Sequence, residues 1–279
     1  MKNTEQRRKN KFFAFFELLY HKFPKLVALN LVYFICILPL ICAAFYLVLG
    51  LFEVSPAIID NTYAAKVFLK LGGIPWLPSV IKGALVLASA IAFGPLTCGF
   101  SYVIRNHATA QHAWFSDFFS RAKENWKQGI ALGIIDIVLC VCLILYLAMD
   151  VSVVASTSYY YVILCMKYIA IFASVLYFMM RFYMYTIAVS VELKLRDIFR
   201  NARLFLVLGA GRNLLSLIII VIAVFSFLST SFIDIVLLAT FLFSFCAFVA
   251  TYLTFPVIKK YMYPSEETEV IEETEEDAD

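Results

Sequence analysis

The most constraining feature of this sequence is a run of 27 residues, 26–52, that contains no charged side chain. An α-helix rises about 1.5 Å per residue, so this run can cross the hydrocarbon core of a bilayer, about 30 Å thick, with some tilt. In the whole chain of 279 residues, 63% of the side chains are hydrophobic and 15% are charged. In water-soluble domains, roughly 45–50% of the side chains are hydrophobic and about 25% are charged. The sequence therefore predicts an all-α integral membrane protein and excludes a water-soluble globular domain.

Six stretches are apolar and long enough to span the membrane, and we expect them to form one polytopic transmembrane domain over residues 1–264. They cover residues 26–52, 79–104, 128–149, 159–190, 213–233 and 235–258. Only Asp234 and a short turn separate the last two, which predicts a tight hairpin. The first stretch is about twice as long as a signal-peptide core, and no small-residue cleavage site follows it. We therefore expect the first span to be retained.

The distribution of Lys and Arg predicts the orientation of these spans. Eighteen of these residues fall on the side that would hold both termini, and only Lys66, Lys70 and Lys82 fall on the opposite side. The cytoplasmic loops of membrane proteins carry the excess of positive charge. We therefore predict a multi-pass protein with both termini in the cytoplasm and a basic inner face that attracts anionic lipids.

Two segments between the spans have the pattern of helices that lie flat at the cytoplasmic interface. Residues 113–126 and 195–208 place apolar side chains on one helical face and charged side chains on the other. The two segments align at an offset of 80 residues, and residues 12–25 precede the first span in the same way. One interpretation is three parallel units, each an interfacial helix followed by a transmembrane hairpin. The alternative is a chance similarity between basic interfacial helices.

The last segment, residues 265–279, carries nine acidic residues and no basic residue. Such a composition predicts a disordered, solvated cytoplasmic tail. The tail either docks on the protein body or on a basic partner, or serves only as a solubilising end.

Apart from Lys82, at the outer mouth of the second span, three charged residues fall inside the predicted spans: Asp136, Lys167 and Arg181. Such residues are costly in hydrocarbon unless they are paired, and they form the candidate intramembrane polar site. The helical rise places Arg181 about 7 Å and Lys167 about 13 Å from the level of Asp136. We therefore predict an Asp136–Arg181 pair, which either fastens two adjacent helices or lines a polar pathway.

Glycines mark two further positions in the spans. Gly129 and Gly133 form a small-xxx-small step that is typical of close helix packing. Gly94 and Pro95, with Gly99 nearby, predict a helix break, either a kink or a partly unwound turn. Such breaks line the substrate sites of some transporters, but they are also common in packed helices.

The sequence contains no pattern typical of a hydrolase, a metalloprotease or a nucleotide-binding protein. Its three histidines lack metal-ligand spacing, and its seven cysteines fall inside the predicted spans, where they act as small apolar residues. We expect no enzymatic activity, no metal, no cofactor and no nucleic-acid partner. The lipid bilayer is the partner that the composition implies.

Two ordered motifs carry a family resemblance. The first runs from Gly94-Pro95-Leu96-Thr97-Cys98-Gly99-Phe100 through Arg105-Asn106 and Ser116-Asp117-Phe118-Phe119 to Asn125-Trp126-Lys127-Gln128, and the second is Leu195-Arg196-Asp197-Ile198 with Asn201-Ala202. They resemble the signatures of the YesL-like family of bacterial integral membrane proteins. The resemblance covers roughly residues 12–260.

The resemblance implies a plasma-membrane protein of Gram-positive bacteria, from a family without an established biochemical activity whose members accompany carbohydrate uptake and utilisation systems. It is an analogy and supplies no mechanism. We expect an accessory or regulatory membrane protein that binds another membrane component, such as the subunits of a carbohydrate importer. The alternative is a small-solute transporter or channel with Gly94, Pro95, Asp136 and Arg181 near its pathway.

Overall fold

The computed structural model describes residues 11–51, 63–74, 78–149, 159–227 and 232–263, and this part of the chain is helical without any strand. The elements, in chain order, are α1 (Lys11–Leu51), α3 (Tyr63–Gly72), α4 (Ser79–Ala108), α5 (Phe115–Glu124), α6 (Trp126–Ala148), α7 (Tyr160–Ala188), α8 (Leu195–Leu208), α9 (Ala210–Phe227), α10 (Phe232–Leu237), the π-helical turn η2 (Leu238–Leu242) and α11 (Phe243–Met262). The predicted all-α polytopic membrane protein is therefore confirmed.

Five of these helices are long and apolar enough to cross a membrane: α1, α4, α6, α7, and the last span, which runs through η2 and α11. A sixth crossing arises if α8 and α9, which meet at an angle of 88°, count together as one broken span. α9 overlaps the predicted span 213–233, and its 18 residues reach about 27 Å. The count of five to six agrees with the six expected.

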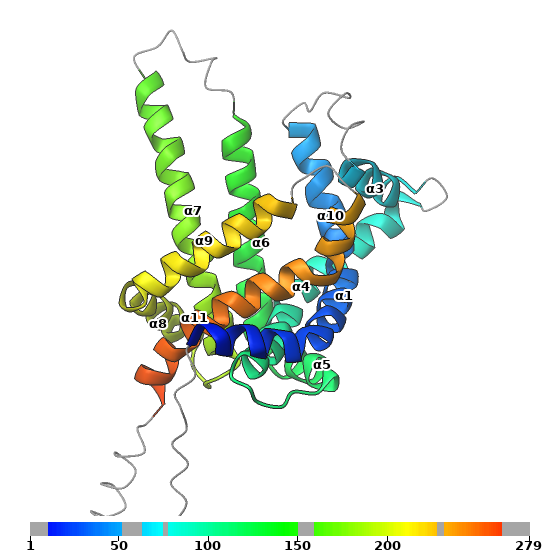
Figure 1. Cartoon of the computed structure of the whole chain (residues 1–279). Helices are drawn as coiled ribbons and strands as arrows, with labels where there is room; N and C mark the ends of the chain where they lie inside the picture. The colour runs from blue at the N-terminus through cyan, green and yellow to red at the C-terminus, as the bar shows by residue number, and fades with distance from the viewer. Residues whose placement is uncertain (1–10, 52–62, 75–77, 150–158, 228–231, 264–279) are drawn as a thin grey trace, which may run out of the picture.

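The described helices form a bundle with two opposite ends (Figure 1). α5, α8, the first turns of α1 and the last turn of α11 lie together at one end, which we call the inner end. α3, the last turn of α6 and the first turn of α7 lie at the opposite end. The described chain thus starts and finishes on the same side of the bundle, as an even number of crossings requires.

Two helix boundaries repeat along the chain at the offset of 80 residues that the sequence suggested. α4 ends at Ala108 and α5 begins at Phe115, while α7 ends at Ala188 and α8 begins at Leu195. α6 and α9 follow, and end at Ala148 and Phe227. α5 and α8, however, end 84 residues apart, at Glu124 and Leu208. The three parallel units therefore stay a prediction.

The N-terminal segment, predicted as an interfacial helix before the first span, is continuous with that span in the structure. α1 is one continuous helix from Lys11 to Leu51 that contains Pro24 and Pro39. Figure 1 shows its first turns lying across the inner end at a steep angle to the rest of the helix. Proline removes one intrahelical hydrogen bond and favours a bend. Pro24 lies at the predicted boundary between the interfacial segment 12–25 and the first span 26–52.

α4 is helical through Gly94, Pro95 and Gly99, so the predicted partly unwound turn is wrong, whereas the alternative of a kink at Pro95 stays a prediction. Packing explains the two glycines. A Cβ atom added to Gly94 would lie 1.8 Å from the carbonyl oxygen of Gly129 in α6, and one added to Gly99 would lie 2.1 Å from the carbonyl oxygen of Phe118 in α5. Both glycines allow a neighbouring backbone to approach α4, which contacts α1, α5, α6, α7 and α11.

The predicted packing role of Gly129 and Gly133 is consistent with this contact. A Cβ atom on Gly133 would lie 2.7 Å from the Cα atom of Gly94, and one on Gly129 would lie 2.7 Å from the backbone of Pro95. Gly94, Gly129 and Gly133 therefore form one crossing point between α4 and α6, where the two backbones touch without intervening side chains.

The turn between the last two spans also differs from the prediction. Asp234 lies inside α10, which begins at Phe232, so it does not form the turn. Residues 228–231, between α9 and α10, lie outside the described residues, as do residues 75–77 and the acidic tail from 265 onward. In the loop 51–73, which the sequence left uninterpreted, residues 63–72 form α3. Tyr46 of α1 donates a hydrogen bond to the Leu69 carbonyl oxygen of α3, at 2.8 Å.

A buried asparagine in α1 holds the π-helical turn η2 in the last span. Asn30, which is fully buried, donates from Nδ2 to the carbonyl oxygens of Leu238 and Ala239, at 3.1 and 2.7 Å. Its Oδ1 accepts the backbone N–H of Ser244 at 2.7 Å. A π-helical turn frees backbone groups from the regular pattern, and one amide side chain satisfies three of them.

Replacing Asn30 with alanine is expected to lower the free energy of unfolding by about 2 kcal/mol, because buried backbone groups lose their partners. Asn201→Ala is the matched control, since Asn201 is half-buried in α8 and has no side-chain hydrogen bond within the described chain. Titration of the purified protein with sodium dodecyl sulfate, followed by circular dichroism, measures both losses. Equal losses for the two variants would contradict the bracing role of Asn30.

Candidate functional site

The residue of most interest in the bundle is Asp136, whose carboxylate is buried in α6 at 3% exposure. Its Oδ2 forms an ion pair with Arg181 Nε of α7 at 2.6 Å. The Tyr185 hydroxyl also donates to Oδ2, at 2.8 Å, and the Tyr177 hydroxyl donates to Oδ1 at 2.6 Å. The predicted Asp136–Arg181 pair is therefore present, within a larger cluster that uses both carboxylate oxygens.

The three partners of Asp136 come from one face of α7. Tyr177, Arg181 and Tyr185 are spaced by four residues, so their side chains follow one another along the helix. Sequence reasoning missed the two tyrosines, although this spacing was visible. We name Asp136, Tyr177, Arg181 and Tyr185 the Asp136 cluster.

Aromatic rings enclose the Arg181 guanidinium. Its central carbon lies 4.9 Å from the ring centre of Tyr185 and 5.6 Å from that of Phe93 in α4. Cation–π contacts of this kind stabilise a desolvated guanidinium in addition to its ion pair. The cluster therefore joins α4, α6 and α7 through one charge pair.

A second polar contact lies between α1 and α4. The Tyr33 hydroxyl and the Thr97 hydroxyl are 2.9 Å apart, and Thr97 also donates to the carbonyl oxygen of Phe93 at 2.7 Å. The Tyr33 ring stacks on Phe100 at a centroid distance of 4.4 Å. Thr97 belongs to the first family-like motif, and its role here is to bind a neighbouring helix.

Chemically, the Asp136 cluster is a fastening between helices. The carboxylate accepts three charge-assisted or phenolic hydrogen bonds, so its acceptor groups are occupied within the protein. A buried charge whose partners are complete needs no further ligand. The geometry favours the fastening interpretation of the pair over a pathway lining.

Lys167 does not join this cluster, although it belonged to the candidate polar site. Its Nζ donates to the carbonyl oxygens of Leu147, at 3.2 Å, and Met149, at the end of α6. The last carbonyl groups of a helix lack intrahelical partners and attract a cation. Lys167 of α7 therefore caps the end of α6. It lies farther along the bundle from Asp136 than Arg181 does, as the helical rise predicted.

The family-like residues Arg105 and Asn106 connect α4 to the turn between α7 and α8. Arg105 Nη1 donates to the Ser190 hydroxyl at 2.8 Å and to the carbonyl oxygen of Val189 at 3.2 Å. Its Nε and Nη2 donate to Asn106 Oδ1, at 3.1 and 2.8 Å. The side chain of Asn106 thus orients the guanidinium that fastens the connection.

The remaining residues of the first motif shape the ends of α5. Asp117 Oδ2 accepts the backbone N–H of Trp114 at 2.8 Å, which caps the start of the helix. Asn125 Nδ2 donates to the carbonyl oxygen of Arg121 at 3.0 Å, at the end of the helix. Trp126 opens α6 with half of its surface exposed and lies 5.7 Å from Lys127 Nζ.

Asp197 and Asn201 of the second motif lie on the first two turns of α8 and are half-buried. Within the described residues neither side chain forms a hydrogen bond with another element. The structure therefore distributes the family-like residues along the inner end and does not bring them together with Asp136.

A further buried amide escaped the sequence reasoning. Asn213 of α9 accepts the Tyr183 hydroxyl at 2.8 Å and donates to the carbonyl oxygen of Leu206 at 2.9 Å, across the bend between α8 and α9. A Cβ atom on Gly209 would lie 2.5 Å from the Tyr183 hydroxyl oxygen, so glycine makes room for this contact. The sequence signal for this contact was the position of Asn213, a polar residue at the start of the apolar run 213–233.

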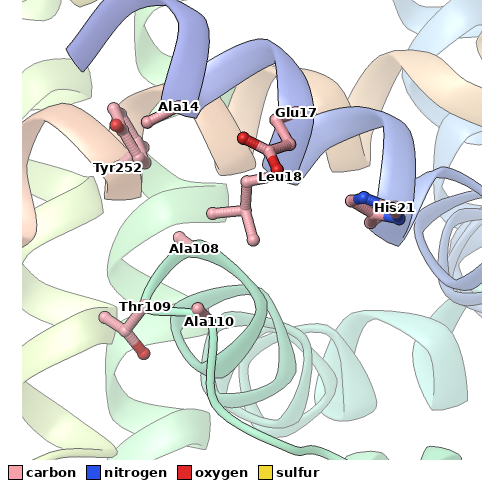
Figure 2. A pocket seen from close by; sticks show the side chains of 8 residues that line it. All are labelled: Ala14, Glu17, Leu18, His21, Ala108, Thr109, Ala110 and Tyr252. Atoms are coloured by element: carbon pink, nitrogen blue, oxygen red, sulfur yellow. The ribbon is translucent and has the colours of Figure 1, made fainter. Parts of the chain in front are cut away.

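A surface hollow of about 440 Å³ opens at the inner end between α1, the end of α4 and α11 (Figure 2). One face of α1 lines it, through Ala14, Glu17, Leu18 and His21; residues 108–110 and Tyr252 line the rest. No residue of the Asp136 cluster belongs to its lining. The hollow is therefore a surface feature separate from the buried charges.

No group of three or more His, Cys, Asp or Glu residues in the described part of the chain could hold a metal ion. Comparisons with family models, with curated proteins and with solved structures gave no match to this chain. The resemblance to the YesL-like family stays a prediction from the two motifs. The contacts within the chain are the basis for its proposed function.

Proposed function

We propose that this protein is an accessory or regulatory protein of the bacterial plasma membrane, which binds a subunit of a carbohydrate uptake system. The observation that carries the accessory role is the internal pairing of the Asp136 cluster. A transport pathway needs polar groups that can exchange partners with a solute, whereas both oxygens of Asp136 are engaged by α7. The carbohydrate class of the partner rests on the family resemblance alone.

The inner end supplies the surface for such a partner, and we place this end in the cytoplasm because the basic residues concentrate there. Trp114, directly before α5, is 73% exposed, and Phe119 and Phe115 of α5 are 49% and 47% exposed. Aromatic side chains are enriched in the centres of protein interfaces, and these lie next to the exposed cations Lys123 and Lys127. The same cations suit anionic lipid headgroups at the membrane surface.

Affinity purification of the tagged protein from its native membrane, in mild detergent, tests the proposal. We expect a stoichiometric importer subunit to co-purify with the wild type. The variant Trp114→Ala/Phe119→Ala should lower its yield about tenfold, since aromatic anchors carry most of an interface's energy. The control is Tyr168→Ala/Phe172→Ala on α7, where both side chains are 65% exposed. A homogeneous wild-type preparation would contradict the accessory role.

The alternative function is a small-solute transporter or channel, and the π-helical turn η2 is the observation that favours it. π-helical turns inside α-helices are frequent at functional sites. If the purified protein is homogeneous, solute flux in liposomes decides for this alternative. The Asp136→Asn variant is then the control for a pathway along α6 and α7.

A further inference from the structure

The exposed face of α8 carries a row of unpaired arginines. Arg196, Arg200 and Arg203 are spaced by four and three residues, which places them on one side of the helix, and all three are exposed. The opposite side, with Ile198 and Ala202, is fully buried in the core. No carboxylate of the described chain lies within ion-pair distance of these three guanidinium groups.

The surroundings of this row are basic as well. Exposed cations on the neighbouring elements are Lys194 before α8, Arg212 on α9, and Lys259 and Lys260 on α11. Two acids lie among them, Glu192 in the preceding turn and Asp197 on α8. With the three arginines, α8 and its surroundings therefore carry seven cationic and two acidic side chains. We call Arg196, Arg200 and Arg203 the α8 basic face.

The chain leaves the described structure beside α8. Tyr261, near the end of α11, stacks on Phe205 at a centroid distance of 6.1 Å, on the buried side of α8 opposite the three arginines. After Met262 the sequence continues into residues 265–279, which hold nine acids and no base. Residues 263–279 can extend up to about 55 Å, whereas the 14 residues of α8 span about 21 Å. The acidic segment can therefore reach every position of the α8 basic face.

We infer that residues 265–279 dock on the α8 basic face of the same molecule. Opposite charges within a few ångströms attract near a protein surface, and three exposed guanidinium groups in a row match a segment with several carboxylates. Docking would shield these arginines from anionic lipid headgroups and from acidic partners. The inference does not depend on the proposed accessory role, because both members of the contact belong to this chain.

Photo-crosslinking in the full-length protein tests this contact. The substitution Val270→p-benzoylphenylalanine places the crosslinker within the acidic segment without removing a charge. The protein is reconstituted at one copy per nanodisc in a neutral lipid and irradiated, and the linked peptides are mapped by mass spectrometry. We expect the products to concentrate in residues 195–208. In 1 M salt, where the screening length is about 3 Å, the yield should fall about tenfold.

A charge variant and its matched control identify the arginines. Arg196→Gln/Arg200→Gln/Arg203→Gln should reduce the crosslink about tenfold, because the acidic segment loses its partners. Lys123→Gln/Lys127→Gln removes two exposed cations at the same end of the bundle and should leave the crosslink unchanged. Products in other helices, in lipid or between two copies would overturn the inference, as would a yield that salt does not change. The salt dependence of the crosslink in the protein with all three arginines still tests the contact if a variant misfolds.

Discussion

Replacing Asp136 with alanine is expected to lower the free energy of unfolding by about 3–5 kcal/mol, the loss found when one partner of a buried ion pair is removed. Arg181 would keep its charge between Phe93 and Tyr185 without the carboxylate that compensates it. The hydroxyl groups of Tyr177 and Tyr185 would lose their acceptor as well. Titration with sodium dodecyl sulfate, followed by circular dichroism, measures the change.

Two further variants separate the charge pair from a general effect of mutation. Asp136→Leu/Arg181→Met removes both charges, and most of the stability should return, because buried ion pairs can often be replaced by apolar residues of similar volume. Lys167→Gln removes a cation that caps α6 and should cost less than 1 kcal/mol, roughly the value of a charge at a helix end. A double variant as unstable as Asp136→Ala would show that the pair does not act as a unit.

Gly94→Ala is expected to lower the free energy of unfolding by about 3 kcal/mol or more, at the upper end of the range for overpacking. The added methyl group would lie 1.8 Å from the carbonyl oxygen of Gly129, a backbone atom that cannot rotate away. α4 and α6 would have to separate, which would also displace Asp136 relative to α7. Unfolding in the same detergent titration gives the size of the effect.

Gly83→Ala is the matched control in the same helix, and the expected effect has the opposite sign. No atom lies within 4 Å of a Cβ added at Gly83, so the substitution adds only the higher helix propensity of alanine, about 0.5–1 kcal/mol. If Gly94→Ala proved as harmless as Gly83→Ala, the close crossing of α4 and α6 would be wrong.

The hydropathy of the sequence was sufficient to predict the architecture, because a lipid environment admits few alternatives to a helix for a long apolar run. Helix ends were predicted less well. α1 continues through Pro24 into the segment expected as a separate helix, and α4 continues through Pro95 without a break. Local residue preferences indicated an interruption in both cases, whereas the helical backbone continues through both prolines, with a steep bend in α1 (Figure 1).

The Asp136–Arg181 contact could be predicted because two helical positions at the same depth determine it. The partners that depend on the rotation of a helix, or on a distant segment, could not be predicted. Asn30 binds η2, more than 200 residues away in the sequence, and no local pattern marks a π-helical turn. The role of Gly94 likewise depends on which face of α6 meets α4.

The central claim is that the charges of the Asp136 cluster hold the bundle together and take no part in the activity. Partner capture by Asp136→Leu/Arg181→Met, compared with the wild type in the same affinity purification, tests it most directly. We expect the folded double variant to retain the same partner at an unchanged yield, since α5 and the inner end are intact. A folded double variant that loses the partner, or a wild type whose solute flux disappears in this variant, would contradict the claim.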